Sequence, residues 1–157
     1  MNVQQADAGD VDAIGAVLRA NAADTSLFQQ PARRVHGSVA EFLVAREGGR
    51  IVGCAEVHHV GDHAEILAVA VSPTAHGKGV GGELVRACVE RARREGAGVV
   101  WLATAKPAYF ARFGFVRMSK WRLPVRVLLG KLWRIFEQPA RRWLPALFGR
   151  HTFMRLP

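Results

Sequence analysis

The stretch 65–82, EILAVAVSPTAHGKGVGG, decides the prediction of the fold. Its residues 66–71 are all apolar, which is typical of a strand buried on both faces, and Ser72 and Pro73 end that strand. Four glycines then lie within the six residues 77–82, where a backbone without Cβ atoms can turn tightly and let a ligand approach its N–H groups. Apolar residues at helical spacing follow, so the sequence predicts a strand, a glycine-rich turn and a helix over 79–95 in succession.

The glycine-rich turn has the properties of a phosphate-binding loop. The first N–H groups of a helix have no partner inside that helix, and the helix dipole favours an anion at this end. Two side chains of the turn can add positive charge, and a turn without a ligand would need fewer glycines. We therefore expect a phosphate group to bind at His76, Gly77, Lys78, Gly79, Val80, Gly81 and Gly82.

Two common phosphate-binding patterns do not fit this turn. The Walker pattern fails because Gly79 follows Lys78, where Ser or Thr is required. The dinucleotide pattern G-x-G-x-x-G is matched by Gly77, Gly79 and Gly82, but it requires a carboxylate at the end of the next strand. That strand is predicted over 99–104 and ends without one.

A third pattern fits. His76-x-x-Gly79-x-Gly81, after a strand ending in V-x-P, resembles motif A of the GNAT superfamily of N-acetyltransferases, with His where Arg or Gln is usual. Residues 42–55 are similar to the family's second and third strands joined by a hairpin, and residues 108–115 to its fourth helix followed by a G-F pair. The aromatic pair before that G-F resembles the branch of amino-acid N-acetyltransferases and N-acetylglutamate synthases.

The resemblance implies an α/β fold of the GNAT type. Its central sheet is expected to be mixed but mostly antiparallel, with helices on both faces and one parallel pair of strands splayed at the cofactor site. We expect a single domain over 1–157, with a basic helical insertion at 117–149 before a last strand at 150–156. The sequence has no apolar run of 18 residues and no recognisable signal peptide, so we expect a cytoplasmic protein.

The resemblance also implies acetyl-CoA as co-substrate, bound between the strands 65–71 and 99–104. Its pyrophosphate is expected on the turn at 77–82, and its pantetheine arm is expected to pair with the first of these strands like an added strand. An amine attacks the thioester directly, and an N–H near Val71 is expected to stabilise the oxyanion. Besides the turn, the implied cofactor-binding residues are Val69, Ala70, Val71, Thr104 and Phe110.

Glu65 is the residue that we expect to take a proton from the attacking amine. The A-E-I at 64–66 resembles the start of this strand in members where the Glu is the base; the alternatives are a Glu that only orients the substrate, and Glu56 as the base. Many members protonate the leaving thiolate with a Tyr four residues before the Gly of the G-F pair, where this chain has Phe110. Tyr109, the only Tyr, points about 100° away on a helix, so either Tyr109 reaches the thiolate or the thiolate leaves unassisted.

The acceptor is expected to be a small primary amine of the amino-acid type, as in the branch that the chain resembles. A loop at 21–35 should contact it: Asp24 could hold an amine, whereas Arg33 and Arg34 could hold a carboxylate. Two alternatives stay open. One is acetylation of a protein or peptide; the other is a CoA-binding regulatory or membrane-associated module with weak catalysis.

Positive charge is concentrated in the last quarter of the chain. Residues 1–116 hold 12 Lys/Arg and 12 Asp/Glu, whereas 117–157 hold 10 Lys/Arg and only Glu137, so the net charge of +9 lies there. This tail could pack on the domain, form a basic lid over the acceptor site, contact a membrane surface through 125–148, or join a homodimer. No recognition motif supports a nucleic-acid partner. The helical face predicted to be apolar consists of Val125, Leu128, Leu129, Leu132 and Phe136.

The cysteines and the clustered histidines have simpler expected roles. Cys54 lies in a predicted strand and Cys88 on the apolar stripe of the helix, so both should be buried thiols in a reducing compartment. His58, His59 and His63 lack the ligand spacing of a metal site and are expected at strand ends or on the surface.

Overall fold

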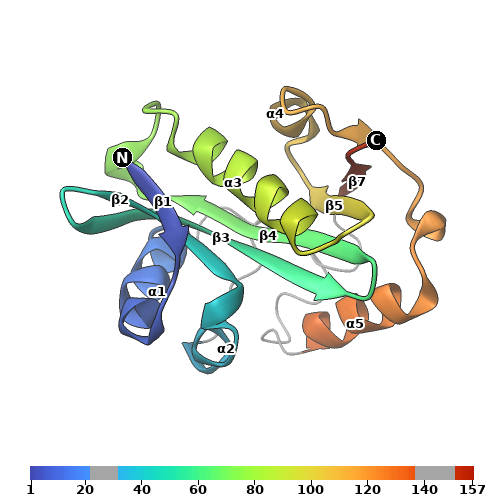
Figure 1. The fold of residues 1–157 in the computed structure, drawn as a ribbon, viewed down its shortest axis with the longest axis horizontal. Helices are drawn as coiled ribbons and strands as arrows, with labels where there is room; N and C mark the ends of the chain where they lie inside the picture. Colours follow the sequence, from blue (N-terminus) through green and yellow to red (C-terminus); the bar gives the residue numbers. More distant parts are fainter. Residues whose placement is uncertain (22–31, 137–150) are drawn as a thin grey trace.

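The computed structural model describes residues 1–21, 32–136 and 151–157. Seven strands form one sheet in the order β1-β2-β3-β4-β5-β7-β6 (Figure 1). The strands are β1 (Asn2–Gln5), β2 (Phe42–Glu47), β3 (Arg50–Val60), β4 (His63–Val71), β5 (Val99–Thr104), β6 (Val116–Arg117) and β7 (Thr152–Arg155). The α-helices are α1 (Val11–Ala20), α2 (Ala32–Gly37), α3 (Val80–Arg94), α4 (Pro107–Ala111) and α5 (Val125–Phe136), and short 3-10 segments include η2 (Val39–Glu41) and η4 (Lys120–Arg122).

The sheet is mixed and mostly antiparallel, which confirms the predicted fold class. Among the described strands, β4 and β5 form the one parallel pair, and their pairing covers only residues 63–65 of β4 and 99–101 of β5. Beyond this point β5 continues in an antiparallel ladder with β7 up to Thr104, whereas β4 has no partner on that side. The two strands therefore diverge in the direction of their carboxyl ends, as the predicted splay requires.

Helices cover both faces of the sheet (Figure 1). Helix α3 buries Leu84, Val85 and Cys88 against one face, where they join a core with residues of β2 to β5. Helix α1 packs Ile14 and Leu18 against the other face of β2, β3 and β4. The stripe of α3 is the one that its helical spacing predicts, and the helix begins and ends within one residue of the expected 79–95.

A bulge in β4 changes which face its residues occupy. Glu56 of β3 lies opposite Leu67, but Cys54, two residues away, lies opposite Ala70, so β4 contains one extra residue. Ala68 adopts a φ of +50°, in the left-handed region that residues other than glycine rarely occupy. Because side chains alternate between the two faces of a sheet, the extra residue moves the side chains that follow it to the opposite faces. Ile66 therefore joins the core under α3, whereas Ala68 and Ala70 join the core under α1.

The face through which helix α5 packs on the sheet overlaps the predicted one only in part, because Leu128 of the predicted face contacts the cluster around Trp101. Val127 and Leu123 are buried with Trp101 of β5, whereas Val125 and Leu129 are 69% and 59% exposed. The expectation that Val125 and Leu129 lie on the packed face is therefore wrong, because Leu123 and Val127, one turn apart, fill the space beside Trp101. Residues 137–149 of the insertion predicted at 117–149 lie outside the described residues. No helix in the described ranges is long and apolar enough to cross a membrane.

Candidate functional site: a cleft between diverging strands

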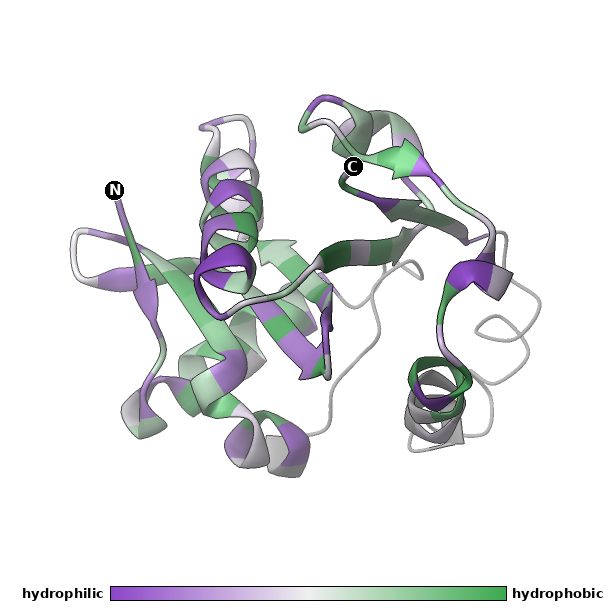
Figure 2. Ribbon diagram, turned by 45° about the vertical axis from the view of Figure 1, so that its right-hand side comes forward, coloured by the Kyte–Doolittle hydropathy of each residue, from purple (hydrophilic) through white to green (hydrophobic). Residues whose placement is uncertain are grey.

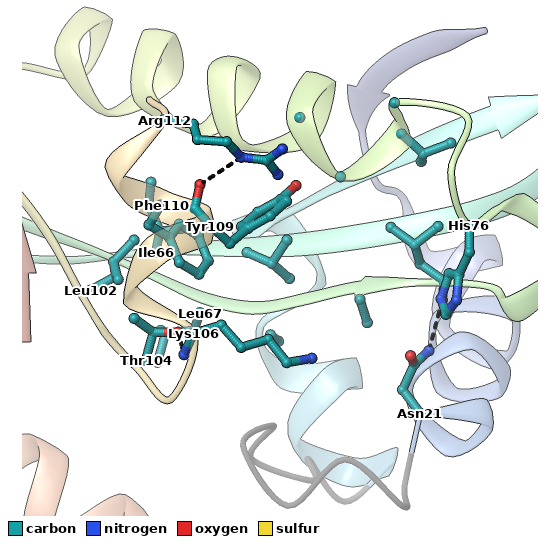
Figure 3. A pocket seen from close by; sticks show the side chains of 18 of the residues that line it. Asn21, Ile66, Leu67, His76, Leu102, Thr104, Lys106, Tyr109, Phe110 and Arg112 are labelled. Carbon is teal, nitrogen blue, oxygen red and sulfur yellow. Dashed lines mark hydrogen bonds between the residues drawn. The ribbon is translucent and has the colours of Figure 1, made fainter. Parts of the chain in front are cut away.

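A cavity opens where β4 and β5 separate (Figure 3). Its volume of about 510 Å³ is in the range of small-molecule and cofactor sites. Residues 66–71 of β4 form one wall, 102–104 of β5 another, and the glycine-rich turn and α4 complete it. The structure thus brings together every predicted cofactor-binding residue except Lys78, namely Val69, Ala70, Val71, His76, Gly77, Gly79, Val80, Gly81, Gly82, Thr104 and Phe110.

The glycine-rich turn presents the start of α3 to this cavity. Gly77 and Gly79 have φ values of +78° and +82°, which glycine adopts without steric cost. Gly79 is the N-cap of α3 and offers no capping side chain, so the N–H groups of the first turn are not capped from there. Since Val80 and Gly81 line the cavity, these N–H groups lie at its wall, where an anion would meet them.

The two cations predicted in the turn have different positions. His76 places its Nε2 2.9 Å from the carbonyl oxygen of Val71, and because a carbonyl only accepts, Nε2 carries the hydrogen. Asn21 also donates to this oxygen, at 3.0 Å, so the two side chains together fix the end of β4. The ammonium of Lys78 instead lies 3.3 Å from Glu47, and its side chain is not part of the cavity wall. Lys78 was expected to add positive charge to the turn, but its ammonium lies beside the β2–β3 hairpin instead.

Two cations that the sequence reading did not select line the cavity. Lys106 follows β5, and its backbone N–H donates to the hydroxyl of Thr104 at 2.9 Å. Arg112 follows α4, with its guanidinium carbon 4.6 Å from the centre of the Tyr109 ring. Arg112 lies in the segment 108–115 that resembles the family's fourth helix, but that resemblance gave a role only to its aromatic residues, and Lys106 precedes the segment.

Tyr109 points towards the glycine-rich turn. A Cβ added to Gly81 would lie 2.6 Å from the Tyr109 hydroxyl oxygen, so this hydroxyl sits against the first turn of α3. Burial raises the pKa of Tyr109, with Arg112 and Arg86 opposing the shift, so the phenol remains a hydrogen-bond donor at neutral pH. Phe110 is buried and packs edge-on against Phe115, with 6.1 Å between ring centres.

Glu65 lies at the fork of the two strands, on the face opposite Ile66. It is 5% exposed, and it is paired with His58 on β3 and Trp101 on β5. A small cavity beside it is also lined by Val127 of α5. Glu65 and Tyr109, the two predicted catalytic residues, are therefore at different ends of the site: one at the closed fork, the other at the glycine-rich turn.

A comparison with protein-family models identifies the family of this chain. Residues 16–115 match the model of the acetyltransferase (GNAT) family. The chain belongs to the GNAT family.

Individual relatives of this GNAT chain point to one branch. It is 29% identical over 127 residues to an amino-acid acetyltransferase of Neisseria meningitidis, covering 79% of this chain but 29% of that protein. It is 32% identical over 121 residues to an amino-acid acetyltransferase of Mycobacterium tuberculosis, covering 74% of this chain and 69% of that protein. The chain thus spans less than a third of the Neisseria relative's length.

Solved structures agree with the fold. Rv2747 from Mycobacterium tuberculosis, solved in complex with CoA, superposes with a TM-score of 0.81 at 26% identity, over 99% of this chain and 98% of that one. N-acetylglutamate synthase from Neisseria gonorrhoeae, solved with CoA and N-acetyl-glutamate, gives 0.79 at 24% identity, over 99% of this chain and 34% of that one.

Beside Glu65, the GNAT domain has a polar cluster that the sequence reading missed. His58 Nδ1 lies 2.9 Å from a carboxylate oxygen of Glu41, and ligand atoms of Glu41, Glu56 and His58 lie within 4.8 Å of one another. Such atoms could hold a divalent cation. The contact between His58 and Glu41 by itself explains why the side chains of these two residues lie close together. The three residues come from different elements, so spacing along the chain gave no signal. His59, on the other face, lies 2.9 Å from Glu95.

The cysteines take no part in this site. Cys54 and Cys88 are buried free thiols, as predicted, and burial raises the pKa of each to about 12. Neither lines the cleft. Most of the expected acceptor loop, residues 22–31 with Asp24, lies outside the described residues, as does the side chain of Arg33.

Proposed function

We propose that this protein transfers the acetyl group of acetyl-CoA to the primary amine of a small, amino-acid-like acceptor. The observation that carries the proposal is the cleft between β4 and β5, which is closed at the fork and bounded at its open end by the glycine-rich start of α3. The similarity to amino-acid acetyltransferases supports the acceptor class. Because the chain spans less than a third of the Neisseria protein, the activity of that whole protein is carried over only as part of this proposal.

The shape of the cleft suits acetyl-CoA. The N–H groups at 77–82 would hold the pyrophosphate, and Lys106 and Arg112 would add positive charge near the phosphates. Past residue 65, β4 has no β5 partner, so the backbone of 66–71 can accept the pantetheine arm as an added strand. The thioester would then lie towards the fork, near Glu65.

In the reaction, the amine lone pair attacks the thioester carbonyl, the C–N bond forms, and the C–S bond breaks to release CoA. The oxyanion needs N–H donors close to the fork. Val71, the residue predicted for this role, lies at the open end beside the turn, whereas the bulge at Leu67 and Ala68 lies two to three residues from Glu65. We assign the oxyanion donors to this bulge.

Glu65 would take the proton that an acceptor ammonium must lose before attack. Lysine-type amines have a pKa of about 10.4, so at neutral pH most acceptor molecules need a base. His58, opposite Glu65 and more exposed than it, would pass that proton on to water, held in place by Glu41. Net transfer releases one proton, because an ammonium becomes an amide and the thiolate takes up one proton.

Tyr109 has a better-supported role at the cofactor than as the acid. Its hydroxyl faces Gly81, where the pyrophosphate would bind, and not the fork where the C–S bond breaks. We propose that Tyr109 donates to the phosphate end of CoA and that the thiolate leaves without a protein acid. A CoA thiolate has an ordinary thiol pKa of about 8.5, so water can protonate it.

Acetyl transfer detected by mass spectrometry tests this proposal. The purified protein is given acetyl-CoA with pooled amino acids, polyamines or peptides, beside Glu65→Gln and the matched exposed variant Glu83→Gln on α3. We expect an acetylated amino acid with the wild type and with Glu83→Gln, and much less with Glu65→Gln. Acetylated peptides in place of amino acids would overturn the acceptor class, and failure to bind CoA would overturn the cleft assignment.

A further inference from the structure

Helix α5 carries a second apolar face that stays exposed. Val125, Leu129 and Trp133 recur every four residues and are 69%, 59% and 71% exposed. Residues four apart share one side of a helix, so they form a ridge about 12 Å long. Trp121 in the preceding η4 is 77% exposed, whereas Val127 on the packed side of α5 is 4% exposed. A helix on a domain surface usually has one apolar face, and the exposed one is unexplained by packing.

Exposed cations accompany this ridge along the chain. Arg117, Lys120, Arg122 and Arg126 are all exposed, and the sequence 117–136 contains no Asp or Glu. The Lys120 ammonium lies 5.0 Å from the centre of the Trp121 ring, so a cation and an apolar ring sit side by side at the start of the segment. Figure 2 shows α5 at the edge of the described part of the molecule, away from α1 and β1.

The charge argues against a second copy of this chain as the occupant of the ridge. A two-fold dimer would place the same patch of each subunit against the other, so one net positive patch would face another. An anionic surface would neutralise them instead. Tryptophan rings with an apolar body and one N–H donor suit the boundary between lipid headgroups and acyl chains.

We propose that α5 and the residues before it dock this protein on the surface of an anionic lipid bilayer. Trp121, Val125, Leu129 and Trp133 enter the headgroup boundary, and Arg122 and Arg126 contact acidic headgroups. The proposal does not depend on the acetyl-transfer reaction, because none of these residues lines the CoA cleft.

Sedimentation of the full chain with vesicles tests the docking. We expect binding to phosphatidylcholine vesicles only when they contain phosphatidylglycerol, and release at high salt. Replacing Trp121 and Trp133 by Ser should lower the partition coefficient onto acidic vesicles at least about tenfold. Arg122→Gln with Arg126→Gln should lower it by about fivefold for each cation removed. The matched controls, Val116→Ser on β6 and Arg50→Gln with Arg94→Gln on distant surfaces, should bind like the wild type.

Three results would overturn the proposal. The first is that the wild type does not bind acidic vesicles, and the second is that the tryptophan variant binds them as well as the wild type does. The third is that the wild type self-associates, the tryptophan variant does not, and vesicles do not change this self-association. CoA binding reports whether each variant is folded. If the tryptophan variant does not fold, quenching of wild-type tryptophan emission by brominated lipid in acidic vesicles decides the question, and its absence would contradict docking.

Discussion

Ala68 is the residue on which the shape of the cleft depends. It has a φ of +50° and lies at the bulge, where β4 contains one extra residue. The bulge reverses which face of the sheet the following side chains occupy, and the edge of residues 66–71 has no partner on β5. A left-handed backbone at a residue other than glycine is strained, and such strain is common where a ligand is gripped.

Substitutions at Ala68 should separate strain from function. Ala68→Gly should leave folding and CoA binding close to wild type, because glycine adopts this φ without strain. Ala68→Val places a β-branched side chain there and should lower the free energy of unfolding by about 1–3 kcal/mol and weaken CoA binding. Urea denaturation and calorimetric titration with CoA measure both. Equal CoA affinity in both variants would show that the bulge does not shape the site.

Gly81 and Tyr109 should be coupled. A Cβ at position 81 would approach the Tyr109 hydroxyl to 2.6 Å but the ring carbon that carries it only to 3.7 Å. Gly81→Ala should therefore displace Tyr109 and weaken CoA binding, and the same substitution in a Tyr109→Phe background should cost less. A double-mutant cycle on CoA affinity measures this coupling. Additive effects would mean that the two residues act separately.

At this scale the sequence predicted the wall of the cleft well but its charges poorly. The glycines were found because local backbone geometry demands their residue type, and the residues of β4 were implied by the family resemblance. Lys106 and Arg112 were missed, and Lys78 points away, since the direction of a long side chain depends on neighbours such as Glu47 from another hairpin.

Helix α3 combines two roles, because its first turn faces the cleft and its apolar stripe holds the core. The stripe includes Cys88, which lies near Cys54 of β3 in the closed interior, where burial raises both thiol pKa values from 9.0 to about 12. The ends of α3 were predicted within a residue because Gly79 and Gly96 mark them, with φ values of +82° and +88°. The packed face of α5 was predicted only in part, since α5 has apolar residues on two sides and only the position of Trp101 selects between them.

Thiol chemistry checks the burial of this element. At pH 9 the thiolate fraction of Cys54 and Cys88 should be about 500-fold lower in the folded protein than after unfolding, so a thiol reagent should label both only on denaturation. Above pH 9 the unfolded chain loses thiol protons that the folded chain keeps until about 12, so stability should fall as pH rises through this window. Rapid labelling of the native protein would contradict the packing of α3 on β3.

The whole molecule is arranged so that two reactants can meet at one fork in the sheet. The cavity extends from the start of α3 on one face to Asn21 at the end of α1 on the other, past the bulge of β4. Glu65, His58 and Glu41 lie on the face covered by α5, separate from the phosphate end of the cleft. The mixed sheet and this fork were implied by the family resemblance, but the polar cluster joins β3, β4 and η2, and only the folded structure brings these together.

The most direct test of this arrangement compares Glu65→Gln with wild type in two assays on the same preparation. The account predicts that kcat for acetyl transfer falls by about 10²–10⁴-fold, the usual contribution of a general base, while the CoA dissociation constant stays within about twofold. Unchanged kcat would contradict Glu65 as the base. A loss of CoA binding equal to the loss of activity would contradict the separation of the base from the cofactor cleft.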